Sequence, residues 1–226
     1  MAAQTEIAWT DSTFNPWWGC QKVGQCCDNC YAAALDNRTG GNFFQQGKQP
    51  KTLSDSYWQQ PLRWQRQAKK SGKHRKVFCG SMCDWTDKDA PADQRDRLWQ
   101  LIRETPMLDW QLLTKRASNI CKCLPNDWGN GYANVWLGVT VENQRQGLRR
   151  MAMLKEVPAQ VRFLSIEPLL EDLGNLDLDG IHWVIVGGES GGKARSMQPE
   201  WVGNIHSQCE SQKVPFFFKQ LGGLGC

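Results

Sequence analysis

An alternation of short apolar segments with segments of helical character constrains the fold of this chain most. The apolar segments are nearly continuously hydrophobic, which is typical of strands that are covered on both faces. They comprise residues 76–81, 110–114, 135–141, 161–166, 182–186 and 215–218. The helical segments comprise residues 93–104, 143–156 and 200–212. This order predicts parallel β/α units and therefore an α/β fold.

The chain has 226 residues, which is long enough to bury one substantial core, so we expect a single domain over residues 1–226. A complete or partial (β/α) barrel of about six parallel strands would use about this length. An open doubly wound sheet is the alternative. Residues 40–57, in which Gly, Gln, Lys and Ser are prominent, are expected to form a loop insertion.

Charge and hydropathy indicate the compartment. Lys and Arg number 27 and Asp and Glu 23, and a pI of about 8.5 is compatible with a nucleic-acid or phosphate-bearing substrate without requiring one. The first residues contain no basic segment followed by an apolar run, and no apolar stretch is long enough to span a bilayer. We therefore expect a soluble, cytoplasmic protein that does not contact a membrane.

Polar side chains follow the expected strands at their carboxyl ends. In parallel β/α folds the loops that leave these ends build the active site, so we expect these residues to line one pocket. They are Ser81, Cys83, Asp84, Thr114, Lys115, Arg116, Glu142, Asn143, Glu167, Pro168, residues 187–190, Lys219 and Gln220.

Four of the ten cysteines lie within residues 20–30. Six residues separate Cys20 from Cys27, and two separate Cys27 from Cys30. A Cys-x-x-Cys pair can hold a metal centre from a turn, and a third thiolate from the preceding loop completes a set of three ligands. Three thiolates leave one iron of a four-iron cluster free, whereas a structural site is normally closed by four ligands. We favour Cys27 over the adjacent Cys26 because Cys27 preserves the two-residue gap. The Ala-rich segment that follows Cys30 is expected to form a helix whose N-terminal end favours an anionic cluster.

Motifs along nearly the whole chain resemble those of one family. They are residues 7–11 (IAWTD), 15–16 (NP), 19–20 (GC), Cys27, residues 30–32 (CYA), 112–116 (LLTKR), 136–143 (WLGVTVEN), 165–169 (SIEPL), 187–191 (GGESG) and 214–220 (VPFFFKQ). By these motifs the chain resembles a phage-associated family whose three-cysteine motif is similar to that of radical S-adenosylmethionine enzymes. The cysteine spacing differs from the Cys-x-x-x-Cys-x-x-Cys of the wider superfamily.

The resemblance implies a radical-SAM-like barrel with a [4Fe–4S] cluster on Cys20, Cys27 and Cys30. The free iron would chelate the amino and carboxylate groups of S-adenosylmethionine. Reduction by an external electron donor would then cleave this cofactor to a 5′-deoxyadenosyl radical, which abstracts a substrate hydrogen. The residues expected to bind the cofactor are Tyr31, Ser81, Asp84, Lys115, Thr140 and Glu142. The residues expected to face the substrate are Glu167, Glu189 and Lys219, as catalytic groups, and Arg195, as a binding group.

The resemblance also implies a modified thymine or another pyrimidine of phage DNA as the substrate, or the matching nucleotide, in the cytoplasm of an infected bacterium. A lyase or decarboxylase that trims an amino-acid-like adduct fits a small protein, and an isomerase or transferase is the alternative. Aromatic and basic side chains could hold splayed nucleotides, although core packing explains the tryptophans equally well. The candidates are Trp17, Trp18, Trp58, Trp64 and Trp85, with Lys69, Lys70 and residues 73–76.

Other uses of the cysteines stay open. A zinc-containing nucleic-acid-binding module would close a tetrahedral site with Cys20, Cys26, Cys27 and Cys30. A thiol hydrolase would need one Cys with a nearby His, and the three scattered histidines offer no such pattern. A second metal site would use the remaining paired cysteines, although one of them lies inside an apolar strand, so core or unpaired thiols are favoured. These cysteines are Cys79, Cys83, Cys121 and Cys123.

Overall fold

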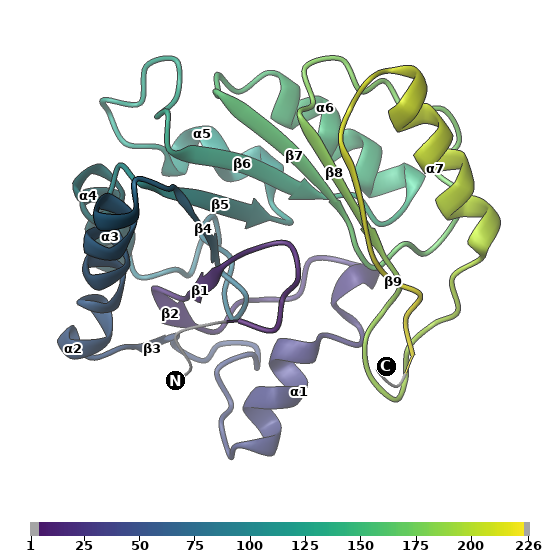
Figure 1. The fold of residues 1–226 in the computed structure, drawn as a ribbon. Coiled ribbons are helices and arrows are strands. Elements are labelled where there is room, and N and C mark those ends of the chain that lie inside the picture. Colours follow the sequence, from purple (N-terminus) through teal and green to yellow (C-terminus); the bar gives the residue numbers. More distant parts are fainter. Residues whose placement is uncertain (1–4, 224–226) are drawn as a thin grey trace.

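A seven-stranded sheet forms the centre of the computed structural model, which describes residues 5–223. All neighbouring strands in it are parallel, and the sheet curls into an open half-barrel (Figure 1). In spatial order the strands are β1 (Ser12–Phe14), β4 (Arg75–Cys79), β5 (Leu108–Thr114), β6 (Val135–Thr140), β7 (Val161–Ile166), β8 (Trp183–Gly187) and β9 (Phe216–Gln220). An antiparallel ribbon of β2 (Trp17–Trp18) and β3 (Lys51–Thr52) lies outside this sheet.

The strand order confirms the expected parallel α/β fold as a partial barrel. The strands follow one another in space in the order of the sequence, from β1 at one edge to β9 at the other. A doubly wound sheet would reverse this order at a switch point, so that alternative is wrong. All six predicted strands are present. The seventh, β1, was not predicted because its three residues are too few to form a hydrophobic pattern.

Helices cover the convex side of the sheet (Figure 1). They include the three predicted helices, found as α4, as the turn η3 continued by α6, and as α7. The predicted helix after Cys30 is also present, as α1, but it lies apart from these helices, below the sheet in the view of Figure 1. The helical elements are η1 (Gln25–Cys27), α1 (Tyr31–Arg38), α2 (Asp55–Trp58), α3 (Gln60–Ser71), α4 (Ala92–Glu104), η2 (Ala117–Asn119), α5 (Ile120–Cys123), η3 (Gln144–Leu148), α6 (Arg149–Lys155) and α7 (Pro199–Ser211). None of the helices in residues 5–223 has the length and apolar character needed to cross a membrane.

Residues 40–57 are more than the loop insertion that we expected. They contain β3 and most of α2. The pairing of β3 with β2 ties the segment to the chain just before Cys20. Trp58, at the end of α2, is buried and packs edge-on against Phe14, with ring centroids 5.1 Å apart. The sequence pattern does not reveal the ribbon because it is held by backbone hydrogen bonds between two-residue strands, not by a run of apolar side chains.

Successive residues of each strand face two separate apolar layers. On the convex side, residues such as Val77 and Leu112 pack beneath the helices. On the concave side, Phe78 and Phe163 pack with Trp9, whose ring centroid lies 4.7 Å from that of Phe78. The N-terminal segment therefore fills the interior of the half-barrel. This packing holds the strands from both faces and fixes the positions at which their carboxyl-terminal loops begin.

The contact between β6 and β7 leaves no room for a side chain at Gly138. A Cβ added there would lie 2.3 Å from the Phe163 ring. We expect Gly138→Ala to lower the free energy of unfolding by about 1–3 kcal/mol, as overpacking does, measured by chemical denaturation. In the control Gly203→Ala, within α7, the new Cβ meets no described atom within 4 Å. That change should stabilise the protein by about 0.5–1 kcal/mol, and equal effects in both variants would contradict the packing.

Candidate functional site

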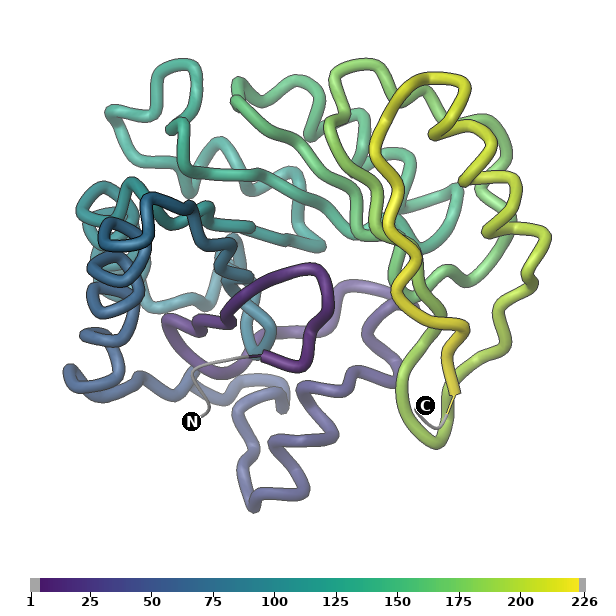
Figure 2. Tube along the Cα trace, viewed as in Figure 1, coloured from purple at the N-terminus to yellow at the C-terminus, as the bar shows by residue number. Residues whose placement is uncertain are grey.

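A cavity of about 370 Å³ lies at the carboxyl ends of the strands. The segment of residues 15–31, here called the cluster loop, crosses the mouth of the half-barrel beside it (Figure 2). Loops that follow β4, β5, β7 and β8 complete the wall together with Lys219 of β9. Ten of the thirteen site residues that we predicted line this cavity. They are Cys20, Cys27, Cys30, Tyr31, Ser81, Asp84, Lys115, Glu167, Glu189 and Lys219.

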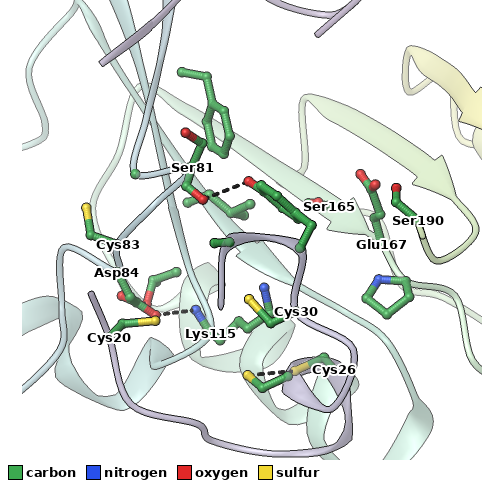
Figure 3. A pocket seen from close by; sticks show the side chains of 18 of the residues that line it. Cys20, Cys26, Cys30, Ser81, Cys83, Asp84, Lys115, Ser165, Glu167 and Ser190 are labelled. Atoms are coloured by element: carbon green, nitrogen blue, oxygen red, sulfur yellow. Dashed lines mark hydrogen bonds between the residues drawn. The ribbon is translucent and has the colours of Figure 1, made fainter. Parts of the chain in front are cut away.

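The cluster loop presents its thiols to this cavity. Figure 3 shows Cys20, Cys26 and Cys30 on the side of the cavity where Lys115 lies. Cys30 is the N-cap residue of α1, so the positive end of the helix dipole lies beside its thiol. Lys115 adds a cationic group close to Cys26, Cys27 and Cys30. Both features favour negative charge at the thiols.

The thiols are arranged around a space instead of meeting at a point. Within residues 5–223, no three His, Cys, Asp or Glu side chains come close enough together to bind a single metal ion. A four-iron cluster occupies a volume between its ligands, so its thiolate ligands surround a cavity. A tetrahedral zinc ion needs four ligands within about 2.3 Å of one centre. The three thiols of Cys20, Cys27 and Cys30 line one cavity, and thiolate is the ligand type that holds iron–sulfur clusters.

Cys26 and Cys27 are the two adjacent candidates for the second of the three predicted ligands. The sulfur atoms of Cys26 and Cys27 lie 3.9 Å apart. This contact lowers the pKa of Cys27 and raises that of Cys26, and burial opposes ionisation of both thiols. Backbone hydrogen bonds at Val23 and Gly24 lower the pKa of Cys27 further. These backbone hydrogen bonds favour the thiolate form of Cys27.

The pKa of Cys20 is shifted in the opposite direction to that of Cys27. Burial raises its pKa to about 12, and the carboxylate of Asp84 adds to this effect. Cys20 is consequently protonated in neutral solution. It becomes a thiolate only when a cationic centre compensates the charge, so metal binding here releases a proton.

One end of the cluster loop is fixed by Arg116. This guanidinium bridges Asp84 and Asp87, with N–O distances of 2.9 Å to each carboxylate. It also donates to the carbonyl oxygen of Gln21. The backbone N–H of Gln21 in turn donates to the Asp87 carboxylate at 2.8 Å. The Asp84 carboxylate accepts a further bond from the backbone of Lys115 at 3.0 Å. Asp84 therefore lines the cavity and holds the loop next to Cys20 at the same time.

The other end of the cluster loop is fixed by Glu189 and Arg195. Arg195 pairs with Glu189 through two nitrogen atoms and donates to the carbonyl oxygen of Gln25 at 2.9 Å. Asn29 donates to Glu189 at 2.8 Å and to the carbonyl oxygen of Lys193 at 2.9 Å. These bonds join the loop after β8 to the residue before Cys30.

The ion pair of Glu189 with Arg195 should make the free energy of unfolding depend on pH. Burial alone would raise the pKa of Glu189, but hydrogen bonds from Arg195 and Asn29 outweigh it and hold this pKa below its ordinary value. A depressed carboxyl pKa stabilises the fold above the unfolded-state pKa of about 4.3, and this contribution disappears as pH falls through the folded-state pKa. Chemical denaturation at several pH values measures this dependence. The free energy of unfolding of Arg195→Leu should be lower than that of wild type at pH 7, and this difference should become smaller in acid.

Substitution of the nearby Lys193 by leucine is the control for the ion pair of Glu189 with Arg195. It also removes one positive charge from the loop, but the Lys193 side chain forms no ion pair within residues 5–223, and its carbonyl group is retained. We expect a small effect that does not change with pH. A deficit of Arg195→Leu that is equal at pH 7 and in acid would contradict the assignment to Glu189.

The wall opposite the thiols carries a second polar group. Lys219 forms an ion pair with Glu167, and both residues line the cavity. Figure 3 shows Glu167 and Ser190 together on this side, away from Cys20 and Cys26. The hydroxyl of Ser190 accepts from Gln220 at 2.6 Å. The cavity therefore has a thiol wall and a wall of charged and hydroxyl groups.

Three of the predicted site residues do not line the cavity. The carboxylate of Glu142 is fully buried and pairs with Arg150, which directs it into the protein. Thr140 is fully buried at the end of β6. Arg195 binds Glu189 and the cluster loop, as described above. Each lies at or after the end of a strand in the sequence, but a side chain there can also point into the core or along the rim.

The cavity also has an apolar wall that the sequence did not predict. It consists of Ile7, Trp9, Phe44, Phe78 and Leu113. Continuous apolar runs do not reveal which residues face the concave side, so Phe78 and Leu113 had no distinguishing signal. The tryptophans considered for base stacking behave differently, because Trp17, Trp58, Trp64 and Trp85 pack in the main core and none lines the cavity.

The remaining paired cysteines do not gather into a second metal site within residues 5–223. Cys79 is buried in β4 and Cys121 is exposed on α5. Cys83 lines the cavity behind Cys20. Burial raises the pKa of both Cys79 and Cys83, so these two behave as core thiols.

Comparison with known proteins adds a family. Neither the curated proteins nor the solved structures contain a match to this chain. One family model matches residues 4–225, which is nearly the full length. The chain therefore belongs to DUF5131, a family described as proteins of unknown function.

Proposed function

We propose that this protein is a radical S-adenosylmethionine enzyme whose [4Fe–4S] cluster is held by Cys20, Cys27 and Cys30. The observation that carries the proposal is that these three thiols, from one loop, line the same cavity at the carboxyl ends of parallel strands. When bound, the cluster supplies the electron that cleaves S-adenosylmethionine to methionine and a 5′-deoxyadenosyl radical.

The chain's own residues bind, orient and exclude water. Cys20 loses its proton on metal binding, while Lys115 and the start of α1 stabilise the negative charge of the loaded site. The contacts of Arg116 with Gln21 and of Arg195 with Gln25 hold the cluster loop at both ends. Tyr31 donates to the carbonyl oxygen of Ser81 at 2.7 Å, which keeps its ring at the cavity wall.

The two remaining walls suit the cofactor and the substrate. The apolar wall with Trp9 and Phe44 can receive a planar base. The ion pair of Glu167 with Lys219 offers both a carboxylate and an ammonium group, which matches the amino and carboxylate groups of an amino-acid-like adduct. The proposed substrate is a modified thymine or pyrimidine in phage DNA, trimmed by a lyase or decarboxylase reaction.

The test starts with anaerobic purification and cluster reconstitution, followed by iron and sulfide analysis. The protein is then reduced with dithionite in the presence of S-adenosylmethionine, and methionine and 5′-deoxyadenosine are quantified. We expect about four irons and four sulfides per chain, as one cubane requires, and release of both products. A colourless zinc protein that leaves the cofactor intact would overturn the proposal and favour a zinc-containing nucleic-acid-binding module. Digestion of modified phage DNA and mass analysis of its nucleosides would then identify the substrate.

A further inference from the structure

A second hollow, here called the basic groove, lies beside the cavity. Its volume is about 600 Å³. It shares Gln21, Lys115 and Arg116 with the cavity, so the two spaces adjoin at these residues. Its other walls come from η2, from the start of α6 with the preceding turn η3, and from the residues that follow Gln21.

Positive charge is concentrated in the basic groove. Seven Lys and Arg residues line it, against the single acid Asp87, in a protein whose net charge is only +4. Arg116 and Arg150 are neutralised by buried carboxylates. Four others are exposed and form neither an ion pair nor a side-chain hydrogen bond with any residue that the structure describes. They are Lys22, Lys88, Arg145 and Arg149.

We infer that the basic groove binds the sugar–phosphate backbone of a DNA strand and so delivers one nucleotide of that strand into the cavity. Unpaired, exposed cations that line a continuous hollow are the electrostatic footprint of phosphate recognition. The inference rests on the proposed function, because it states how a DNA substrate reaches the reacting cavity. It adds a binding surface that lies outside the predicted site residues except Lys115.

The chemistry of the groove favours nucleic acid over an acidic protein. Protein interfaces place aromatic and other apolar side chains at their centre. The groove contains no aromatic residue, and its apolar lining is limited to Val23, Ala117 and Met153. Interfaces with nucleic acid are more polar and more positively charged, as this one is. Ser118, which is exposed at the groove, adds a neutral hydroxyl donor for a phosphate oxygen.

The adjoining cavity has what an extruded base requires. Enzymes that modify a base in DNA take it out of the stack and hold it against aromatic or apolar side chains. Trp9 and Phe44 supply such a wall, and Lys115 stands at the junction between cavity and groove. A strand whose phosphates lie in the groove can therefore place its next base against this wall.

The experiment measures binding of a fluorescein-labelled single-stranded 12-mer of deoxythymidine by anisotropy at several salt concentrations. The test variant is Arg145→Glu/Arg149→Glu. The control is Arg63→Glu/Arg66→Glu on the exposed face of α3, which changes the net charge equally but lies away from the groove. Four phosphate contacts predict a slope of log affinity against log salt of about −3 for a single strand. We expect the test variant to bind at least about tenfold more weakly, with a slope shallower by about 1.4, and the control to bind like wild type.

Equal binding by wild type and the test variant, or equal losses in the test variant and the control, would overturn the inference. A test variant that binds the oligonucleotide normally but no longer accepts electrons from a flavodoxin-type protein would assign the groove to an acidic protein partner instead. Dithionite-driven cleavage of S-adenosylmethionine is measured in the same samples. If wild type binds DNA through the groove but cleaves no cofactor, the proposed function fails alone. If it cleaves the cofactor and the test variant retains DNA binding, this inference fails alone.

Discussion

Replacement of Cys27 or Cys30 by alanine is expected to abolish the brown colour of the reconstituted protein and its cleavage of S-adenosylmethionine. Each change removes one of three proposed thiolates, and no other thiol in residues 5–223 lies at the start of α1 to replace Cys30. Loss of an outer-shell partner of a metal site already costs about 10- to 100-fold, so loss of a ligand should exceed that range. Iron content, visible absorbance and product release give three independent measurements.

Two further cysteine variants serve as controls. Cys121 is exposed on α5 and lies outside the cavity, so Cys121→Ala should behave like wild type. Cys26→Ala tests the choice between the adjacent pair, because a three-thiolate cluster on Cys27 should retain its iron, whereas a four-cysteine zinc site should lose its metal. If Cys26→Ala loses the cluster and Cys27→Ala keeps it, the ligand assignment is wrong.

Replacement of Arg150 by methionine is expected to destabilise the fold by about 3–5 kcal/mol. The Glu142 carboxylate is fully buried, and Arg150 is its ion-pair partner. The Oε1 atom of Glu142 has no hydrogen-bond partner among the described residues. Arg150 also donates to the carbonyl oxygen of Thr140 at 3.2 Å. Without the guanidinium, a buried charge stays unpaired. Denaturant unfolding near neutral pH measures the loss.

The double variant Glu142→Leu/Arg150→Met separates charge from packing. It removes both partners and fills the space with apolar side chains, so most of the lost stability should return. The exposed neighbour Arg149 provides a control, since Arg149→Met should change the free energy of unfolding by no more than about 0.5 kcal/mol. A double variant that is no more stable than Arg150→Met would show that shape, not the unpaired charge, causes the loss.

The roles of Glu189 and Arg195 show how far a position in the sequence can mislead. Both follow a predicted strand, and the resemblance assigned one to catalysis and the other to the substrate. In the fold they pair with each other and bind the backbone at Gln25 and the side chain of Asn29. The contacts with Asn29 and Gln25 span 160 and 170 positions of the chain. No local pattern encodes such a pairing.

Local patterns, in contrast, predicted most of the framework. The parallel strands β4 to β8 bury residues on both faces, so each leaves a continuous apolar run in the sequence, whereas the three-residue strand β1 is too short to do so. The thiol spacing marked Cys20, Cys27 and Cys30 because ligands on one loop must lie near one another in the sequence. The parallel arrangement then brought Ser81, Lys115 and Glu167 to one edge of the sheet.

The sequence by itself thus determined the parallel α/β arrangement, the thiol loop and the edge at which the polar residues gather, since these depend on hydrophobic periodicity and on short-range spacing. Tertiary structure alone decided which side chains enter the cavity. It turned Glu142 into the core toward Arg150, tied the cluster loop to Arg116 and Arg195, and gathered the cations of the basic groove. These outcomes depend on side-chain direction and on contacts between distant segments, where burial of a charge requires a partner that only the folded chain supplies.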